Sequence, residues 1–453
     1  MKAAERIRRK MEEKGVMEPA IRSFLRARDL VVKGQSAGIP EESITPAEGV
    51  RVFSALPQTA LFRPELLAQT VVIKLNGGLG TGMGLAQAKS LLEVRPGVTF
   101  LDLMTRQVAA LRESTRAQVK FLLMNSQATS ADTKAYLKEH SNLVENVEDL
   151  EFVQNWAPKL DPEAMEPVSW DADPSQEWCP PGHGDLYPAL AGSGTLEALL
   201  EEGIRYAFVS NSDNLGATLD PTLLHAFVES RAPFMMEVTR RTESDRKGGH
   251  LAVRKEDGRF ILREVAQCPD EDLSQFQDIS KHQFFNTNNI WLDLIAVKEV
   301  MDENEGVLPL PVITNRKTVD PRDGDSSPVI QLEQAMGAAI EAFDGATAMD
   351  VPRTRFAPVK TTGDLLALRS DAYEMSEDGH IGLVGGREGK PPLISLSKEY
   401  RFVDALEALG VPSLKEARRL EVEGEVSFEE GVIIRGDAVF SHSGKVAAGS
   451  YGS

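Results

Sequence analysis

The chain contains 453 residues, and 42% of them are hydrophobic, so it can bury a sizeable core in about three domains. A formal net charge of −19 argues against nucleic acid as a partner, so any phosphate ligand must be held by a few local cations. The two cysteines lack metal-ligand spacing, and no apolar run is long enough to span a membrane. We therefore expect a cytoplasmic protein without a disulfide framework, a zinc site or a membrane span.

Apolar patterns predict the framework of the chain. Ile21, Phe24 and Leu25 at helical spacing indicate a helical packing extension over residues 1–50, with a break between Gly34 and Pro40. Beyond it, strand and helix patterns alternate, as βαβ units require. Helix patterns lie at 98–111, 128–140 and 329–343, and strand patterns at 71–75, 119–124, 151–156, 206–210, 234–238, 251–253 and 260–265.

A glycine-rich loop follows the strand predicted at 71–75. Five glycines, at positions 77, 78, 80, 82 and 84, separate Asn76 from Lys89. This spacing is neither the dinucleotide fingerprint nor a P-loop, which argues against a nicotinamide dehydrogenase or a Walker-type ATPase. Glycines permit positive φ and a close approach of backbone N–H groups to a ligand. The loop is therefore predicted to bind phosphate rather than to form a plain structural turn.

Two further segments carry candidate ligand residues, one in a loop and one at the end of a predicted strand. Gly182 and His183 come directly after two prolines, so we expect this loop to hold one geometry. Asn211, Ser212 and Asp213 follow the strand at 206–210, at the end of a strand where an α/β sheet binds its ligands. Asp213 can bind Mg²⁺ through oxygen, or it can cap the following helix.

Two later segments carry weaker signals. The asparagine cluster of Phe285–Trp291 suits the hydroxyls of a sugar, and equally suits ordinary turn chemistry. Lys360 precedes a helix start with Thr361 as the predicted cap, a favourable place for an anion, although a lone lysine is usually a solvated surface charge.

The C-terminal segment has a six-residue period. Leu420, Val426, Val432 and Ala438 recur every six residues, and so do Val422, Phe428, Ile434 and Phe440. This period is typical of a β-helix. Two ordinary hairpins remain the alternative, because few repeats are visible, and we favour the β-helix.

Several stretches together resemble the UTP:glucose-1-phosphate uridylyltransferase family, the eukaryotic-type UDP-glucose pyrophosphorylases. They run in the family's order between about residues 70 and 375 and are KLNGGLGTGMG, AKSLLEV, LLMNS, CPPGHGDLY, FVSNSDNLGATLD, FNTNNIW, VIQLEQAMGAAI and VPRTRFAPVKTTGDLL. The combination is highly specific, although no single motif is. Ala88 departs from the proline that many members have there, and the chain ends soon after Phe440, before the longer β-helix of eukaryotic relatives.

The resemblance implies an α/β fold. A Rossmann-like, GT-A-like nucleotidyltransferase core, with a mixed sheet flanked by helices, would span residues 51–378, and a small left-handed β-helix would span 390–453. The implied reaction is Mg²⁺-dependent and reversible, and it converts UTP and glucose 1-phosphate into UDP-glucose and pyrophosphate. The implied roles are UTP binding by Leu75, Asn76, Gly77 and Gly78, phosphate binding by Lys89 and Lys360, uracil contact by Gln154 and Gly182, sugar-phosphate contact by His183, sugar and metal contact by Asn211, Ser212 and Asp213, and glucose binding by Asn288.

The expected mechanism needs no base from the protein. The nucleophile is the phosphate of glucose 1-phosphate, which is largely dianionic at neutral pH because its second pKa is about 6. Two polyanions must approach, so Lys89, Lys360 and Mg²⁺ on Asp213 are the expected catalytic groups. We expect in-line attack on the α-phosphorus without a covalent intermediate, and His183 as a hydrogen-bond donor rather than a proton shuttle.

Other functions stay open at this point. A pyrophosphorylase for UDP-N-acetylhexosamines, or a broad-specificity UDP-sugar enzyme, is the nearest rival, although GHGD followed by FNTNN favours glucose. A catalytically silent UDP-sugar-binding protein is less favoured, because both lysines and Asp213 are present. The acidic surface and short β-helix suit a monomer or a homodimer.

Overall fold

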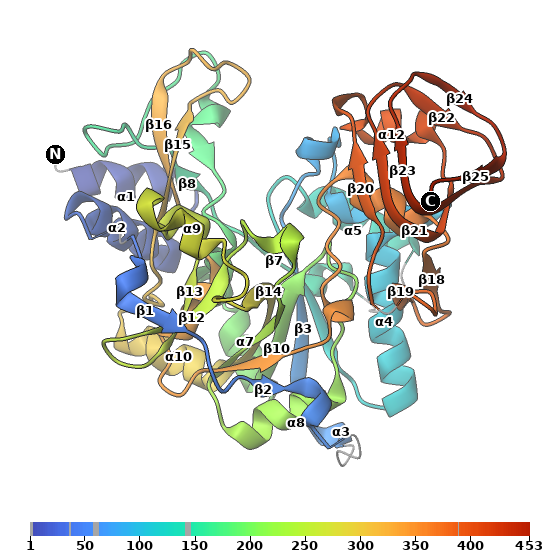
Figure 1. Ribbon diagram of the computed structural model, residues 1–453. Coiled ribbons are helices and arrows are strands. Elements are labelled where there is room, and N and C mark those ends of the chain that lie inside the picture. Colours follow the sequence, from blue (N-terminus) through green and yellow to red (C-terminus); the bar gives the residue numbers. More distant parts are fainter. Residues whose placement is uncertain (1–2, 36–37, 58–62, 141–145, 388) are drawn as a thin grey trace.

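A mixed sheet of eleven strands forms the centre of the computed structural model, which describes residues 3–35, 38–57, 63–140, 146–387 and 389–453. Eight strands follow the order β2-β17-β11-β14-β10-β3-β6-β7, and β12 joins β1 and β13 to β14 (Figure 1). Along the sheet the bounds are β2 (Arg51–Val52), β17 (Thr347–Asp350), β11 (Phe234–Arg240), β14 (Phe284–Asp293), β10 (Tyr206–Asn211), β3 (Thr70–Asn76), β6 (Lys120–Asn125) and β7 (Glu151–Val153), with β1 (Ile44–Pro46), β12 (His250–Arg254) and β13 (Phe260–Arg263) at one side.

Strand β3 lies at the middle of the parallel part of this sheet. All seven of its residues are buried, as its apolar run predicts for a strand covered on both faces. It pairs in parallel with β10 and β6, and β6 pairs in parallel with β7. The carboxyl ends of these four strands therefore meet at one edge, where ligands of such sheets bind.

Helices cover both faces of the sheet. Buried residues of α4, α8 and α11 pack on the face that presents Val72 and Phe208, and those of α6, α7 and α10 pack on the face that presents Val71 and Ile73. The helices are α1 (Ala3–Glu13), α2 (Glu18–Val32), α3 (Pro64–Ala68), α4 (Phe100–Thr115), α5 (Ser130–His140), α6 (Leu186–Gly192), α7 (Thr195–Glu201), α8 (Pro221–Ser230), α9 (Leu273–Phe276), α10 (Leu294–Glu303), α11 (Thr362–Arg369) and α12 (Val403–Leu409).

The N-terminal residues form a helical hairpin and then enter the sheet. Ile7 and Met11 of α1 and Phe24 of α2 share a hydrophobic cluster with Leu160 and Leu332. The extension is therefore helical over α1 and α2, as predicted, and α2 ends at Val32, just before the predicted break at Gly34 to Pro40, of which residues 36 and 37 lie outside the described residues. The extension also supplies β1, which pairs with β12, so it does more than cover the core.

The helix predicted at 329–343 is wrong. Residues Pro328–Glu333 form strand β16, which pairs with β15 (Ile313–Thr318), and Met336–Glu341 form a 3₁₀ helix, η11. Ile330 exchanges backbone hydrogen bonds with Leu160 at 2.9 and 2.8 Å, so pairing with distant chain decides the conformation. The β-branched Val329 and Ile330 suit a strand.

The C-terminal segment consists of short parallel strands beside the core (Figure 1). β20 (Leu393–Leu396), β21 (Ser413–Val422), β23 (Val432–Phe440) and β25 (Gly449–Tyr451) form one sheet, and β22 (Val426–Phe428) pairs with β24 (Gly444–Val446). Leu420 pairs with Ala438 and Val426 with Gly444, and all the predicted inward residues except Phe440 are buried. The remaining strands form two-stranded sheets: β4 (Glu93–Arg95) with β5 (Val98–Thr99), β8 (Ala157–Pro158) with β9 (Trp178–Cys179), and β18 (Tyr373–Met375) with β19 (Ile381–Leu383).

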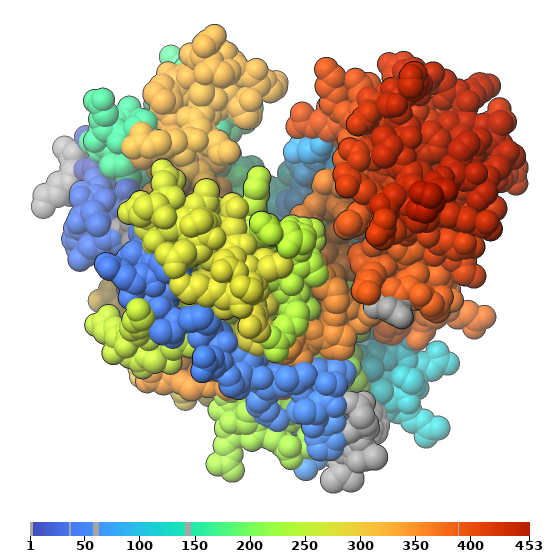
Figure 2. Space-filling view, viewed as in Figure 1, coloured from blue at the N-terminus to red at the C-terminus, as the bar shows by residue number. Residues whose placement is uncertain are grey.

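A broad notch separates the C-terminal strands from β15 and β16 (Figure 2). Within the described residues, no helix combines the length and the apolar character that a membrane span needs.

Candidate active site

The glycine loop folds back on its own start. The backbone N–H of Lys89 donates to Gly78 O at 3.1 Å, so Lys89 returns to the end of β3. Of the five glycines, Gly84 alone has a positive φ, of 81°. A Cβ on Gly77 would lie 2.7 Å from Gln154 Oε1, whereas a Cβ on Gly78 or Gly82 would meet open space. Gly80 and Gly84 are also closely approached, by the side chains of Leu85 and Phe402. The loop therefore leaves room for a ligand at Gly78 and Gly82.

Lys89 and Asp213 form an ion pair at the carboxyl edge of the sheet. Lys89 Nζ donates to Asp213 Oδ2 at 2.8 Å, and both side chains are about one-fifth exposed, at 18% and 20%. Asp213 does not cap the next helix, because Asp220 does so for α8. Asp213 Oδ1 is buried and has no hydrogen-bond partner among the described residues. An acceptor without a donor at this place suits a cation.

Lys360 is linked to Asp213 through the backbone of the preceding residue, Val359. The N–H of Val359 donates to Asp213 O at 3.1 Å, and Pro358 forms an isolated bridge with Asn214. A threonine caps α11, as the sequence predicts, and this residue, Thr361, forms a capping box with Asp364. The Lys360 side chain is exposed, and within the described chain no hydrogen bond or ion pair engages its ammonium group. Lys89 is therefore paired with Asp213, the backbone beside Lys360 is bonded to Asp213, and the ammonium of Lys360 is available to a ligand.

A buried network holds the Lys360 segment against Asp213. Glu237 is fully buried on β11 and accepts hydrogen bonds from Arg355 Nε and Nη2, both at 2.8 Å. Glu237 also accepts from Asn289 Nδ2 at 3.0 Å and from Trp291 Nε1 at 2.9 Å. Asn214 accepts from the N–H of Ala357 at 2.9 Å. The segment that precedes Lys360 is thereby tied to two strands.

The two residues predicted to contact uracil touch each other. Gln154 Nε2 donates to Gly182 O at 3.0 Å, and Gln154 Oε1 lies against Gly77. Gly182 has a φ of 84°, and a Cβ there would lie 2.6 Å from Gln334 O, so only glycine fits this position. The three residues bring the glycine loop, the end of β7 and the loop after the prolines together.

His183 is held as a neutral hydrogen-bond donor. The N–H of Met336 donates to His183 Nδ1 at 2.9 Å, so the ring proton of the neutral imidazole lies on Nε2. Burial lowers the pKa of His183 to about 4, which keeps the ring neutral at neutral pH. Nε2–H can therefore donate to a phosphate oxygen and cannot act as an acid near pH 7.

Asn288 lies at an irregularity of β14. The pairing of β14 with β11 shifts between Glu237 and Val238, and Asn288 has a φ of 57°, which asparagine tolerates better than most residues. Its side chain is half-buried and accepts from Asn286 Nδ2 at 2.9 Å. The cluster is therefore part of a strand with a bulge and not a turn.

Some of the predicted ligand residues serve the framework first. Asn76 Nδ2 donates to Asn125 Oδ1 at 2.7 Å and to Thr133 Oγ1 at 3.1 Å, so its side chain joins β3 to β6. Leu75 is buried, and its carbonyl accepts from the N–H of Ser212 at 3.1 Å. Asn211 lies beside Leu75 in the parallel pairing of β10 with β3. These contacts place the start of the glycine loop and Asp213 next to each other.

Comparison with known proteins decides the family. Residues 21–435 match the family model described as UTP–glucose-1-phosphate uridylyltransferase. The chain belongs to this family. A UTP–glucose-1-phosphate uridylyltransferase of Saccharomyces cerevisiae is 42% identical over 376 residues, which are 82% of this chain and 74% of the yeast protein.

Solved structures of similar proteins extend over nearly the whole chain. A UDP-glucose phosphorylase of Trypanosoma brucei is 50% identical, with a TM-score of 0.91 over 99% of this chain and 97% of that one. A mutant UDP-glucose pyrophosphorylase of Leishmania major in complex with UDP-glucose is 45% identical, with a TM-score of 0.92 over 99% of both chains. The uridylyltransferase-family fold therefore includes the mixed sheet and the C-terminal strands.

Sequence reasoning missed a buried lysine in this uridylyltransferase-family site. Lys74 on β3 donates to Ser210 Oγ at 2.8 Å and to Ala217 O. Burial and, to a smaller extent, the nearby Arg355 lower the pKa of Lys74 to about 7, while Glu237 opposes the shift. The signal was a charged residue within an otherwise apolar run. Through these two hydrogen bonds, Lys74 links β3 to β10 and to the segment that follows Asp213.

Proposed function

We propose that the chain transfers the uridylyl group of UTP to glucose 1-phosphate, which gives UDP-glucose and pyrophosphate reversibly. The observation that carries this proposal is the meeting of Lys89, Asp213 and the Lys360 segment at the carboxyl edge of the sheet, beside the Gln154–Gly182 contact. Family membership agrees with it.

In this mechanism the sugar phosphate attacks the α-phosphorus in line and displaces pyrophosphate. Lys89 and Lys360 reduce the repulsion between the two anions, and they do most where charge develops on the leaving group. His183 Nε2–H donates to an oxygen of the sugar phosphate. Gln154 and Gly182 contact the base, backbone of Leu75–Gly78 holds the nucleotide, and Asn211, Ser212 and Asn288 contact the sugar side.

We place a Mg²⁺ ion at Asp213. The partnerless buried oxygen Oδ1 supports this placement, and carboxylate oxygen suits Mg²⁺. The described residues contain no group of three or more His, Cys, Asp or Glu side chains that could hold a metal, so substrate phosphates and water would complete the coordination. The ion would supply positive charge against the phosphates when bound.

The decisive experiment measures pyrophosphate release. We expect release from UTP only when glucose 1-phosphate and Mg²⁺ are both present, and release without the sugar phosphate, or none in any mixture, would overturn the proposal. A higher kcat/KM for N-acetylglucosamine 1-phosphate than for glucose 1-phosphate would transfer the assignment to the N-acetylhexosamine enzymes.

The wider architecture is proposed on the same basis. We divide the chain into an extension (1–50), a catalytic domain (51–378) and a C-terminal left-handed β-helix (390–453). Parallel pairing of Val426 with Gly444, at an offset of three six-residue repeats, supports a β-helix. Free cysteines suit the cytoplasm, and we propose a monomer or homodimer, which light scattering would distinguish.

A further inference from the structure

We propose that Ser23 of helix α2 is a positioning residue for the uridine nucleotide, because it holds Gln334 against the loop that carries Gly182 and His183. This inference rests on the proposed function, in which that loop contacts UTP. It assigns the N-terminal hairpin a part in nucleotide binding, beyond its packing on the core.

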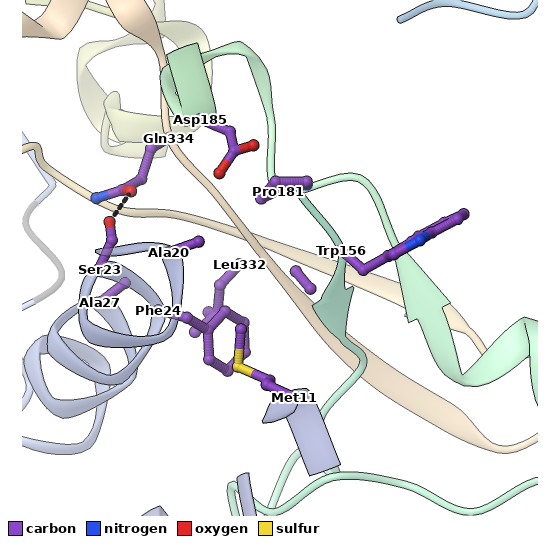
Figure 3. A pocket seen from close by; sticks show the side chains of 11 residues that line it. Met11, Ala20, Ser23, Phe24, Ala27, Trp156, Pro181, Asp185, Leu332 and Gln334 are labelled. Carbon is purple, nitrogen blue, oxygen red and sulfur yellow. Dashed lines mark hydrogen bonds between the residues drawn. The ribbon is translucent and has the colours of Figure 1, made fainter. Parts of the chain in front are cut away.

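The first link is one hydrogen bond across the chain. Ser23 Oγ donates to Gln334 Oε1 at 2.8 Å, and Ser23 is 6% exposed (Figure 3). Gln334 Nε2 donates to Leu310 O at 3.3 Å, so both ends of its amide are engaged. Without the Ser23 hydroxyl, the amide oxygen would lose its donor in a largely buried place and the side chain would turn to find another.

The second link is the backbone of Gln334. Its N–H donates to Pro181 O at 3.1 Å, and its carbonyl accepts from the N–H of Gly184 at 2.8 Å. Positions for a Cβ on Gly182 and on Gly184 lie 2.6 and 2.8 Å from Gln334 O, so the loop touches Gln334 without spare room. A displacement of Gln334 must therefore move Gly182. It must also disturb the Met336 bond that orients His183.

A second anchor lies at the start of α2. The N–H of Met17 donates to Asn155 Oδ1 at 3.3 Å, and the N–H of Asn155 donates to Asp185 Oδ2 at 2.6 Å. Asn155 follows Gln154, and Asp185 follows the glycine-flanked histidine. Helix α2 thus contacts the supports of both residues that are proposed to contact uracil.

A small cavity between α2 and the loop makes room for a conservative substitution at Ser23. It measures about 20 Å³ and is lined by Ser23, Phe24, Leu332, Gln334 and Asp185, among others (Figure 3). This volume is close to that of one water molecule, so it can accept the extra methyl group of threonine without a large shift. Ser23→Thr keeps the hydroxyl, and Ser23→Ala removes it.

The test compares Ser23→Ala, Ser23→Thr and wild-type protein. We expect Ser23→Ala to raise KM for UTP and the calorimetric Kd for UDP-glucose about fivefold, while kcat changes less than about twofold. Ser23→Thr, which keeps the hydroxyl, should have the KM and Kd of the wild-type protein. Ser230→Ala removes a hydroxyl that donates to Phe227 O on α8, away from the site, and should leave them unchanged.

A double-substitution cycle separates positioning from packing. Gln334→Met removes the same hydrogen bond from its other side, so the double variant Ser23→Ala/Gln334→Met should raise KM no more than the more damaging single change. If the increases in KM of the two single variants multiply in the double variant, the positioning role is overturned. It is also overturned if Ser23→Ala lowers Tm but leaves KM and Kd unchanged. If the wild-type protein binds UDP-glucose but releases no pyrophosphate, the proposed reaction fails and Kd still tests Ser23. Absence of UDP-glucose binding would overturn both.

Discussion

Lys89 and Lys360 approach the same aspartate from distant parts of the chain. Lys89 does so by a direct ion pair, and Lys360 through the hydrogen bond of its neighbour Val359. Lys89 is paired and Lys360 is exposed. In the proposed mechanism, a phosphate ligand would therefore have to separate Lys89 from Asp213 but would meet Lys360 without a competing partner. The two lysines are thus not equivalent before substrates bind.

Removal of either lysine should slow the chemical step. We expect Lys89→Ala and Lys360→Ala each to lower kcat by about 10² to 10³, because each cation acts on charge that grows in the transition state. Steady-state kinetics with circular dichroism as a folding check would measure this. Lys120→Ala, which breaks a surface ion pair with Glu202, is the matched control and should turn over normally. Wild-type turnover by a folded variant would remove that lysine from the mechanism.

His183 should contribute no protonation step between pH 5.5 and 8.5. Burial lowers its pKa to about 4, so the ring stays neutral across this range. We expect His183→Asn to reduce kcat/KM for glucose 1-phosphate and to keep the shape of the pH profile of kcat. Loss of a limb near pH 6.5 in the variant would show that His183 transfers a proton.

At the scale of elements, strand β11 and the Lys360 segment are joined by one carboxylate. Glu237→Gln should lower the free energy of unfolding by about 3–5 kcal/mol, because it leaves the buried Arg355 without its counter-ion. Urea denaturation would measure the change. Glu256→Gln, at an exposed position after β12, is the control. A loss no larger than the control's would mean that Arg355 is held by its other bonds.

Local patterns predicted those elements whose conformation depends on neighbours in sequence. The apolar run of β3 and the threonine cap of α11 both follow from residues a few positions apart. Strand β16 was missed because its partners, Leu160 and β15, lie elsewhere in the chain. The conformation of such a segment follows from tertiary pairing, which a single sequence does not display.

Contacts between distant parts of the chain also limited how much of the candidate site the sequence could predict. Asp213 was predicted from its place at a strand end, and Lys89 from the glycine loop that it follows. The roles of Glu237 and Gln334 depend on contacts with Arg355 and Ser23, and no spacing in the sequence links these pairs. Lys74 had a visible signal, a charge in an apolar strand, which was not used.

At the scale of the whole molecule, two stacked histidines join the N-terminal segment to the sheet. The rings of His250 and His282 lie 4.0 Å apart, and His282 Nε2 contacts Glu41 Oε1 at 2.9 Å. Burial lowers the pKa of both histidines. Burial alone would raise the pKa of Glu41, but bonds from Lys281 and His282 bring it to about 2.

Stability should therefore fall as the pH falls. Below about pH 6.5 the unfolded chain takes up protons on histidines that the folded chain keeps neutral. Below about pH 4.5 the unfolded chain also protonates Glu41, which the folded chain keeps ionised. We expect a lower urea midpoint at pH 5.5 than at pH 7.5. His282→Gln should reduce this difference, whereas His442→Gln, at an exposed position, should not. Equal pH dependence in both variants would contradict this account.

The order of the sheet has a consequence for synthesis of the protein. β2, formed by Arg51 and Val52, pairs with β17, which begins at Thr347, and Lys360 follows ten residues after β17 ends at Asp350. A nascent chain on the ribosome can therefore complete the glycine loop and the Gly182–His183 loop well before Lys360 is synthesised. The edge of β11 that β17 covers therefore has no partner until more than a hundred further residues are made, and an unpaired strand edge can pair with another chain.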